Sequence, residues 1–258
     1  MDKKVIERHW YADIYEQQEN QTDDRNFMLK VIGDQPKNIL EVCCGGGRLL
    51  VPLAKAGHTV TGLDSDAAML AKIPPKAEGL ANLSYRQADA VQDDWGEGFE
   101  IVVLAANIMI NIESSMECKQ AQQLFIQKAA KALKKGGYLY LDFFLEAHPE
   151  KRFNFQNEGF VVFEGVDSVG THGRYTVMNG AFDPDTQLHT RTCRTEITPK
   201  DSETFVFEHA SHTHIPTLMQ VMGWLERAGF AVEHSYGDFS GNPMDETTSR
   251  AILWARKR

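Results

Sequence analysis

Two carboxylates and a run of glycines in the first quarter of the chain could together hold a nucleoside that also carries a cation. Glu41 lies near the end of an apolar run, residues 39–42, glycines follow at 45–47, and Asp64 ends a second apolar run, residues 59–63. Glycine permits close approach of main-chain N–H groups to a ligand. An acid at the end of the second strand can accept hydrogen bonds from ribose hydroxyls. Glu41, at the tip of the first strand, would attract an ammonium group.

The spacing of these residues separates two classes of nucleoside ligand. A dinucleotide-binding loop reads G-x-G-x-x-G, but Leu50 stands where its third glycine is expected. Glu41 also precedes the glycines, where it would repel a pyrophosphate. A ligand with a ribose and a cationic amino-acid end suits both acids, and S-adenosylmethionine is such a ligand. We expect this cofactor, with S-adenosylhomocysteine as its product, and keep a nicotinamide-dependent oxidoreductase as the less favoured alternative.

The order of the motifs resembles that of the class I, Rossmann-like, S-adenosylmethionine-dependent methyltransferases of the small-molecule type. The family's first motif is an acid followed by alternating glycines, and Glu41 to Gly47 match it with Cys43 in place of the first glycine. Later motifs of the family follow in order at Gly62-Leu63-Asp64, Asp89-Ala90 and residues 133–139.

The resemblance implies an α/β fold with a seven-stranded, mainly parallel sheet, helices on both faces and the last strand antiparallel. Residues 1–145 and 216–258 would form this Rossmann-like, cofactor-binding domain. Within residues 146–215 the alternation of strands and helices stops, and β-rich runs are separated by turn-forming segments. We interpret this segment as an inserted antiparallel β-sheet that caps the substrate site.

The resemblance also implies a set of cofactor contacts. Asp89 would accept a hydrogen bond from the adenine amino group, and Met69 would pack on the adenine, although a methionine in a helix is also typical of a core. Arg48 would pair with the carboxylate of the cofactor or lie on the surface, and Trp95 could cover the adenine. The expected cofactor contacts are Tyr11, Tyr15, Glu41, Cys43, Gly45, Gly47, Arg48, Asp64, Ser65, Met69, Asp89, Ala90 and Ala106.

The two tyrosines belong to a segment with helical spacing of its aromatic residues, from Lys3 to about Gln18. In methyltransferases that the chain resembles, a similar segment closes over the cofactor. Tyr11 and Tyr15 are therefore expected cofactor contacts. The same spacing also fits a helix that packs its aromatic side chains on the rest of the domain.

The acceptor and any general base are expected at two places. Ligands of open α/β sheets lie at the carboxyl ends of the strands, which is where Asn107 follows the fourth predicted strand. His212 and His214 share one face of a predicted strand by alternation and could supply a base or orient the acceptor, or they could be exposed histidines of the sheet. These three residues are the catalytic candidates. No carboxylate or cysteine spacing completes a metal site, so no metal is expected.

Composition narrows the range of partners. Lys plus Arg number 27 against 36 for Asp plus Glu, a net charge of −9, and this disfavours a nucleic-acid partner. The sequence has no apolar run of the roughly 20 residues that span a bilayer, and its start is polar. We expect a cytoplasmic monomer or homodimer that does not bind membranes. Its predicted reaction is methyl transfer to N or O of a small molecule, with a non-catalytic S-adenosylmethionine-binding protein as the alternative.

Overall fold

The computed structural model describes residues 2–156 and 159–258, which form two compact units. The smaller unit consists of Met1–Asn20 and His148–Ile215, and the larger unit consists of Gln21–Ala147 and Pro216–Arg258. The predicted division placed residues 1–20 with the larger domain, whereas their contacts place them with the β-rich unit. No helix in the described ranges is long and apolar enough to cross a membrane.

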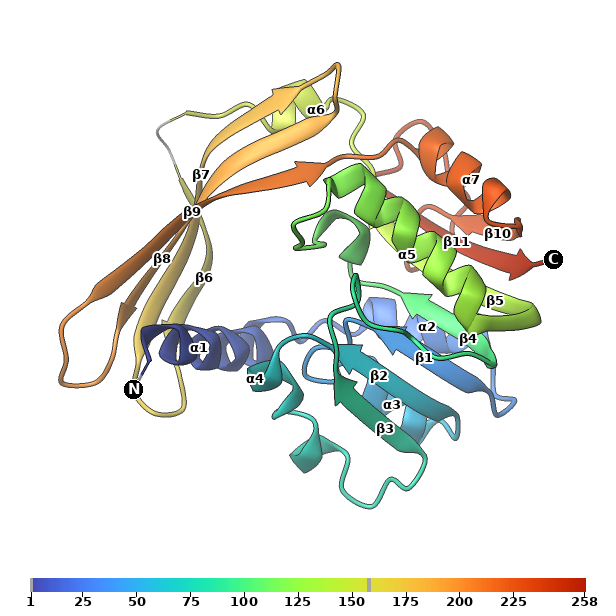
Figure 1. Cartoon of the computed structure of the whole chain (residues 1–258), viewed down its shortest axis with the longest axis horizontal. Helices are drawn as coiled ribbons and strands as arrows, with labels where there is room; N and C mark the ends of the chain where they lie inside the picture. Colours follow the sequence, from blue (N-terminus) through green and yellow to red (C-terminus); the bar gives the residue numbers. More distant parts are fainter. Residues whose placement is uncertain (1, 157–158) are drawn as a thin grey trace. The chain divides into compact units, whose positions relative to one another are not determined.

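The larger unit is built on a seven-stranded sheet with the order β10-β11-β5-β4-β1-β2-β3 (Figure 1). The pairs β1–β2, β1–β4, β2–β3 and β4–β5 are parallel, whereas β11 is antiparallel to both β5 and β10. The predicted mainly parallel sheet with an antiparallel last strand is therefore confirmed. Its strands are β1 (Asn38–Val42), β2 (Thr59–Asp64), β3 (Leu83–Gln87), β4 (Phe99–Leu104), β5 (Leu133–Phe144), β10 (Phe230–Tyr236) and β11 (Arg250–Lys257).

Helices bury both faces of this sheet, because the strands are apolar on both sides. One core cluster includes Phe125 and Trp224, from α5 and α7, and the other includes Met28 and Leu53, from α2 and α3. The predicted layering with helices on both faces is thus confirmed. The helices of this unit are α2 (Asp23–Ile32), α3 (Leu50–Lys55), α4 (Ala67–Leu70), α5 (Cys118–Ala132) and α7 (Leu218–Arg227), with short 3₁₀ turns at Pro74–Lys76 and Ile108–Ile110.

The smaller unit is a four-stranded antiparallel sheet with the order β6-β7-β8-β9. Its strands are β6 (Phe160–Val166), β7 (His172–Asp183), β8 (Leu188–Thr198) and β9 (Phe205–His214), accompanied by α1 (Lys3–Gln18) and α6 (Pro149–Arg152). Trp10 of α1 packs directly on the backbone of Gly173, where a Cβ would lie 2.3 Å from the indole ring. The indole Nε1 donates to the carbonyl oxygen of Gly165 at 3.0 Å. Glycine at position 173 therefore admits α1 onto the sheet.

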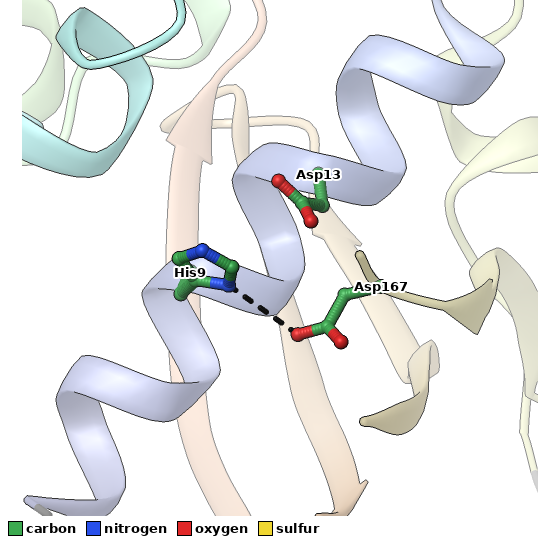
Figure 2. A group of neighbouring side chains, drawn as sticks. All are labelled: His9, Asp13 and Asp167. Atoms are coloured by element: carbon green, nitrogen blue, oxygen red, sulfur yellow. Dashed lines mark hydrogen bonds and ion pairs between the residues drawn. The ribbon is translucent and has the colours of Figure 1, made fainter. Parts of the chain in front are cut away.

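A polar cluster joins the same helix to the β6–β7 turn, as Figure 2 shows. His9 and Asp13 lie one helical turn apart on α1, and His9 Nδ1 is 3.3 Å from Asp167 Oδ2. Asp167 Oδ1 accepts from the backbone N–H groups of Val169 at 3.0 Å and Thr171 at 2.7 Å. Asp167 therefore shapes the turn and binds the helix at the same time.

Asp167→Ala should destabilise the protein, because the β6–β7 turn loses the buried acceptor of two amides together with the contact to His9. Hydrogen bonds of this kind typically contribute about 0.5–1.5 kcal/mol each, and more when the acceptor is charged. We expect the free energy of unfolding in urea to fall by about 2–4 kcal/mol. Asp185→Ala in the exposed β7–β8 turn is the matched control. Equal losses in both variants would contradict this role of Asp167.

Candidate active site

The loop after β1 has the backbone conformation of a glycine-rich turn even where it lacks glycine. Gly45 and Gly47 have φ values of +53° and +80°, and Cys43 has +59°. A non-glycine residue in this left-handed region costs about 1–3 kcal/mol and is concentrated at functional sites. Cys43, at the position of the first glycine of the family's motif, therefore adopts a backbone conformation that glycine adopts without strain.

Asp64 lies at the end of β2 and contacts this loop. Its Oδ2 accepts from the backbone N–H of Gly45 at 2.7 Å, and its Oδ1 accepts from the N–H of Asp66 at 2.8 Å. Burial raises the pKa of Asp64, and the amides of Asp66 and Gly45 partly oppose that shift. Each carboxylate oxygen has two lone pairs, so each can accept a further hydrogen bond. Asp64 is thus held in a fixed orientation in which it can bind the two hydroxyls of a ribose.

Glu41 is the buried carboxylate of the site. Its side chain is 4% exposed, and Oε2 is shielded from solvent without a hydrogen-bond partner among the described residues. Burial raises the pKa of Glu41 to about 8, with Arg48 acting in the opposite direction. An ionised buried carboxylate needs a cationic partner. The ammonium group of S-adenosylmethionine is a cation that would satisfy this acid.

The space beside Gly45 is closed by Met69. A Cβ at Gly45 would lie 3.0 Å from Met69 Cε, so only glycine leaves the loop and Met69 undisturbed. Met69 is 9% exposed and belongs to α4, whose N-cap is Asp66. The loop, Glu41, Asp64 and Met69 therefore form a cradle of backbone amides, two acids and one apolar side chain, which fits the cofactor that the sequence predicts.

Arg48 has a different partner from the predicted one. Its Nη1 and Nη2 donate to Asp24 Oδ1 and Oδ2 at 2.8 and 2.6 Å, and Nη1 also reaches the carbonyl oxygen of Gln21 at 3.3 Å. This bidentate geometry directs the guanidinium to the start of α2. Arg48 therefore fixes the glycine loop against α2, and we no longer expect it to bind the cofactor's carboxylate directly.

The remaining cofactor candidates at this edge follow β2 and β3. Ser65 and Asp89 are exposed, whereas Ala90 is buried. Asp89 Oδ1 accepts from the N–H groups of Val91 at 2.8 Å and Gln92 at 3.2 Å. This turn presents the carboxylate of Asp89 beyond the end of β3, so its predicted contact with the adenine amino group stays a prediction.

Trp95 does not cover a ligand. It is 3% exposed, its ring packs edge-on against Phe125 with centroids 5.3 Å apart, and its Nε1 donates to the carbonyl oxygen of Ala90 at 2.8 Å. The expectation that Trp95 packs on the adenine is wrong, because the indole belongs to the hydrophobic core between sheet and α5.

A buried ion pair holds the segment that follows β4. Asp142 of β5 is 1% exposed, with Oδ1 2.6 Å from Arg250 Nη1 and Oδ2 accepting from the N–H of Ala106 at 3.0 Å. Arg250 Nη1 also donates to Asn107 Oδ1 at 3.3 Å. Ala106 and Asn107 both have left-handed backbone, with φ values of +57° and +61°. Asn107, a catalytic candidate, is therefore positioned by Arg250, which the sequence reasoning did not single out.

The two predicted catalytic histidines differ in exposure. His212 is exposed, with Nδ1 3.2 Å from Thr190 Oγ1, whereas His214 is 1% exposed. Both lie on β9, opposite Thr190 and Leu188 of β8. The burial of His214 is against direct contact with an acceptor, so His212 is the histidine of this pair that we retain.

Tyr11 and Tyr15 lie on α1 and pack on aromatic residues of the smaller unit. Tyr11 contacts Phe163 edge-on at 5.4 Å between centroids and Tyr175 at 6.1 Å, and Tyr15 lies 6.1 Å from Phe163. This confirms a helix that packs its aromatic residues on a sheet. Contact of either tyrosine with the cofactor stays a prediction.

One group of side chains outside this site has metal-ligating chemistry. This group consists of His9, Asp13 and Asp167, and it contains one possible ligand atom from each residue. The three atoms lie within 4.8 Å of one another (Figure 2). No sequence pattern indicates this group, because Asp167 is distant in the chain from the two helical residues. Asp13 Oδ2 and Asp167 Oδ1 already accept from backbone amides, so we interpret the group as structural. The expectation that no metal takes part in the reaction stays a prediction.

Comparison with known proteins agrees with this geometry. Residues 39–137 match a family described as a methyltransferase domain. A protein of Geobacillus sp. (strain WCH70) named as a methyltransferase is 27% identical over 251 residues, covering 89% of this chain and 88% of its own length. An S-adenosylmethionine-dependent methyltransferase of Clostridium acetobutylicum ATCC 824 superposes with a TM-score of 0.72 at 14% identity, over 96% of this chain and 97% of the other. The sugar N-methyltransferase KedS8 of Streptoalloteichus sp. ATCC 53650 gives a TM-score of 0.68 at 15% identity, over 96% and 93%.

The pKa of Glu41 predicts that cofactor affinity depends on pH. Below about pH 8 this carboxyl is mostly protonated, and binding an ammonium requires it to ionise. Affinity should therefore fall by up to about tenfold per pH unit as the pH decreases from about 8 to about 6, with close to one proton released per cofactor bound. Calorimetry in two buffers of different ionisation enthalpy measures that proton.

Two controls isolate the carboxyl group. Adenosine lacks the ammonium, so its affinity should not follow the same pH dependence. Glu41→Gln cannot ionise, so its binding of S-adenosylmethionine should be weaker at high pH and should release no proton. If Glu41→Gln released the same proton as the unmodified protein, another group would be responsible.

Arg250 predicts a strong energetic coupling with Asp142. Arg250→Met leaves a buried carboxylate without its cation, and such losses typically destabilise by about 3–5 kcal/mol. The double variant Arg250→Met with Asp142→Asn removes the stranded charge and should recover part of that stability. Urea unfolding of the single and double variants measures the coupling energy. Strict additivity would contradict a direct interaction.

Proposed function

We propose that this chain, which belongs to the class I S-adenosylmethionine-dependent methyltransferases, transfers a methyl group to a nitrogen or oxygen atom of a small molecule. The observation that carries the proposal is the buried, unpartnered carboxylate oxygen of Glu41 next to a left-handed loop and the oriented carboxylate of Asp64. Glu41 can bind a cation, the loop amides can bind an acceptor group, and Asp64 can bind a diol. S-adenosylmethionine has all three kinds of group.

The residues of the chain act mainly by holding the reactants. The cofactor, when bound, supplies a methyl group on positively charged sulfur. Glu41 would bind its ammonium group, the loop amides would bind its carboxylate end, and Asp64 would bind its ribose. Correct alignment of two reactants can supply about 7–11 kcal/mol of the barrier reduction, so a methyl transfer requires little further chemistry from the protein.

The acceptor is proposed to be a small molecule with an amine or hydroxyl group. The likeness to a sugar N-methyltransferase supports this class. The net charge of −9 gives no support to a nucleic-acid acceptor. An amine needs only to be deprotonated before attack, whereas a hydroxyl more often needs a general base. His212 is the proposed base or orienting group, because it is exposed on its strand.

The smaller unit is proposed to be the part that selects the acceptor. It interrupts the larger unit between β5 and α7, and the carboxyl ends of the strands are where α/β sheets bind ligands. A sheet inserted after β5 would contribute side chains that bind the acceptor. Replacement of His212 by Ala should then lower turnover and leave cofactor affinity unchanged.

The central test is the formation of S-adenosylhomocysteine from S-adenosylmethionine with a panel of small amines and phenols. Product formed only in the presence of one acceptor class supports the proposal. Binding of S-adenosylhomocysteine without turnover on any acceptor would favour the alternative of a non-catalytic protein. Tighter binding of NADH than of S-adenosylhomocysteine would contradict the cofactor assignment.

Asp64 supplies a specific prediction of the same proposal. Asp64→Ala should weaken adenosine binding by about 1–3 kcal/mol, because the ribose hydroxyls lose their acceptor. The matched ligand is 2′,3′-dideoxyadenosine, which lacks both hydroxyls and should lose much less affinity. Calorimetry on the two proteins with the two ligands isolates the hydroxyl contact. Equal losses for both ligands would assign Asp64 to loop structure instead.

A further inference from the structure

Arg191 of β8 is a half-buried cation without an acidic partner in the described part of the chain. Its Nε is shielded from solvent and makes no hydrogen bond. Other arginines of the same sheet are paired. Arg194 lies 3.1 Å from Glu196 and 3.4 Å from Glu208, and Arg174 lies 2.7 Å from Glu164. Because successive side chains of a strand point to opposite faces, Arg191 lies on the face away from Arg194.

The face that carries Arg191 is covered at both ends by packed aromatic residues. At one end Tyr11 of α1 contacts Tyr175, whose hydroxyl donates to Cys193 Sγ at 3.2 Å. At the other end Phe153 lies on the ring of His189, with centroids 4.5 Å apart. Arg191 lies between Cys193 and His189 on this face of β8. The arginine therefore occupies a polar stretch of the sheet between two aromatic clusters.

The two neighbouring strands place a hydroxyl group and a β-bulge beside Arg191. Ser211 of β9 lies directly opposite it and brings a hydroxyl group to the same face. On the β7 side the register shifts between Met178 and Ala181, and the intervening Asn179 has a φ of +52°. This β-bulge interrupts the ladder next to Arg191, and bulges are common beside ligand sites.

Burial and the charge of Arg191 lower the pKa of His189, the next residue on the same face of β8. His189 is 3% exposed, and neither of its ring nitrogens has a hydrogen-bond partner among the described residues. Burial, and then Arg191, lower the pKa of His189 to about 4. A neutral imidazole, a hydroxyl and an arginine thus lie on adjacent positions of one face, and none of the described carboxylates pairs with this arginine. This set can donate hydrogen bonds to an anion.

We propose that Arg191, with Ser211 beside it, binds an anionic oxygen group, a carboxylate or a phosphate, of the methyl acceptor. The inference rests on the proposed function in one respect, namely that the ligand is the acceptor. The guanidinium fork matches the two oxygens of such a group, and a charge-assisted pair is stronger than a neutral hydrogen bond. An arginine left without an acid in a partly buried position is stabilised when an anion binds to it.

The first experiment measures anion binding without cofactor. Inorganic pyrophosphate and benzoate are titrated into the full-length protein, and the pKa of His189 is followed by NMR of its ring. Both anions are tested because the group could be a phosphate or a carboxylate. Binding of either should raise the pKa of His189, since the anion offsets the charge of Arg191. No binding of either at millimolar concentration, or binding that leaves His189 unchanged, would overturn the proposal.

Matched variants locate the site. Arg191→Met should weaken the binding of the anion by at least tenfold, whereas Arg194→Met, on the opposite face of the same strand, should leave it unchanged. Arg191→Lys keeps the charge without the fork and serves if the methionine variant does not fold. Wild-type affinity in a folded Arg191→Met or Arg191→Lys variant would overturn the assignment, as would equal losses in Arg191→Met and Arg194→Met.

A second measurement separates this inference from the proposed function. S-adenosylhomocysteine affinity should be the same in Arg191→Met and in the unmodified protein. Turnover is then measured with pairs of acceptors, each consisting of an anionic acceptor and its neutral ester. Arg191→Met should raise KM at least tenfold for the anionic acceptor and leave KM for the ester unchanged. Failure of cofactor binding in the unmodified protein would reject the proposed function and leave the anion titration valid. Normal cofactor binding with equal KM changes for both members would reject the anion site alone.

Discussion

A carboxylate buried at the tip of β1 is the constraint on which the larger unit depends. Glu41 lies in the central part of the sheet, between β2 and β4, where an ionised acid is strongly unfavourable without a cation. The surrounding structure keeps it there, because Asp64 ties the end of β2 to the loop and Arg48 ties the loop to α2. These contacts orient the loop without a ligand, so a ligand would find its binding groups already oriented.

The sequence predicted the larger unit well because its determinants are local. Short apolar runs that end in Glu41 and Asp64, with glycines after the first run, specify parallel strands whose carboxyl ends meet at one edge. The conformation of Cys43 was not readable from its type, since cysteine rarely adopts positive φ. The left-handed conformation of Cys43 accompanies that of Gly45 and Gly47, and Met69 packs on Gly45 as a tertiary contact.

What the sequence did not show has one physical cause, which is pairing between residues distant in sequence. Arg48 forms an ion pair with Asp24. Asn107 accepts a hydrogen bond from Arg250, which belongs to the last strand of the chain. Trp95 belongs to the core because Phe125 of α5 covers it. Asp142, an acid within the apolar run of β5, could have indicated that a nearby strand must supply a cation. No local pattern could indicate which residue would do so.

Each unit contains a shielded ionisable side chain with an atom that has no hydrogen-bond partner among the described residues. Arg174 and Arg194 of the four-stranded sheet pair with carboxylates, and an arginine of the same sheet without such a partner is therefore informative. The two shielded groups have opposite charges when ionised. Glu41, in the larger unit, is a buried acid that could bind an ammonium, and Arg191, in the smaller unit, is a half-buried cation that could bind an oxyanion. Each group is held by a strand and cannot move away to solvent, so the free energy of its charged form depends on what binds to it. Fixed charges of this kind select ligands by sign and geometry, because a ligand of the wrong charge would leave them unpaired.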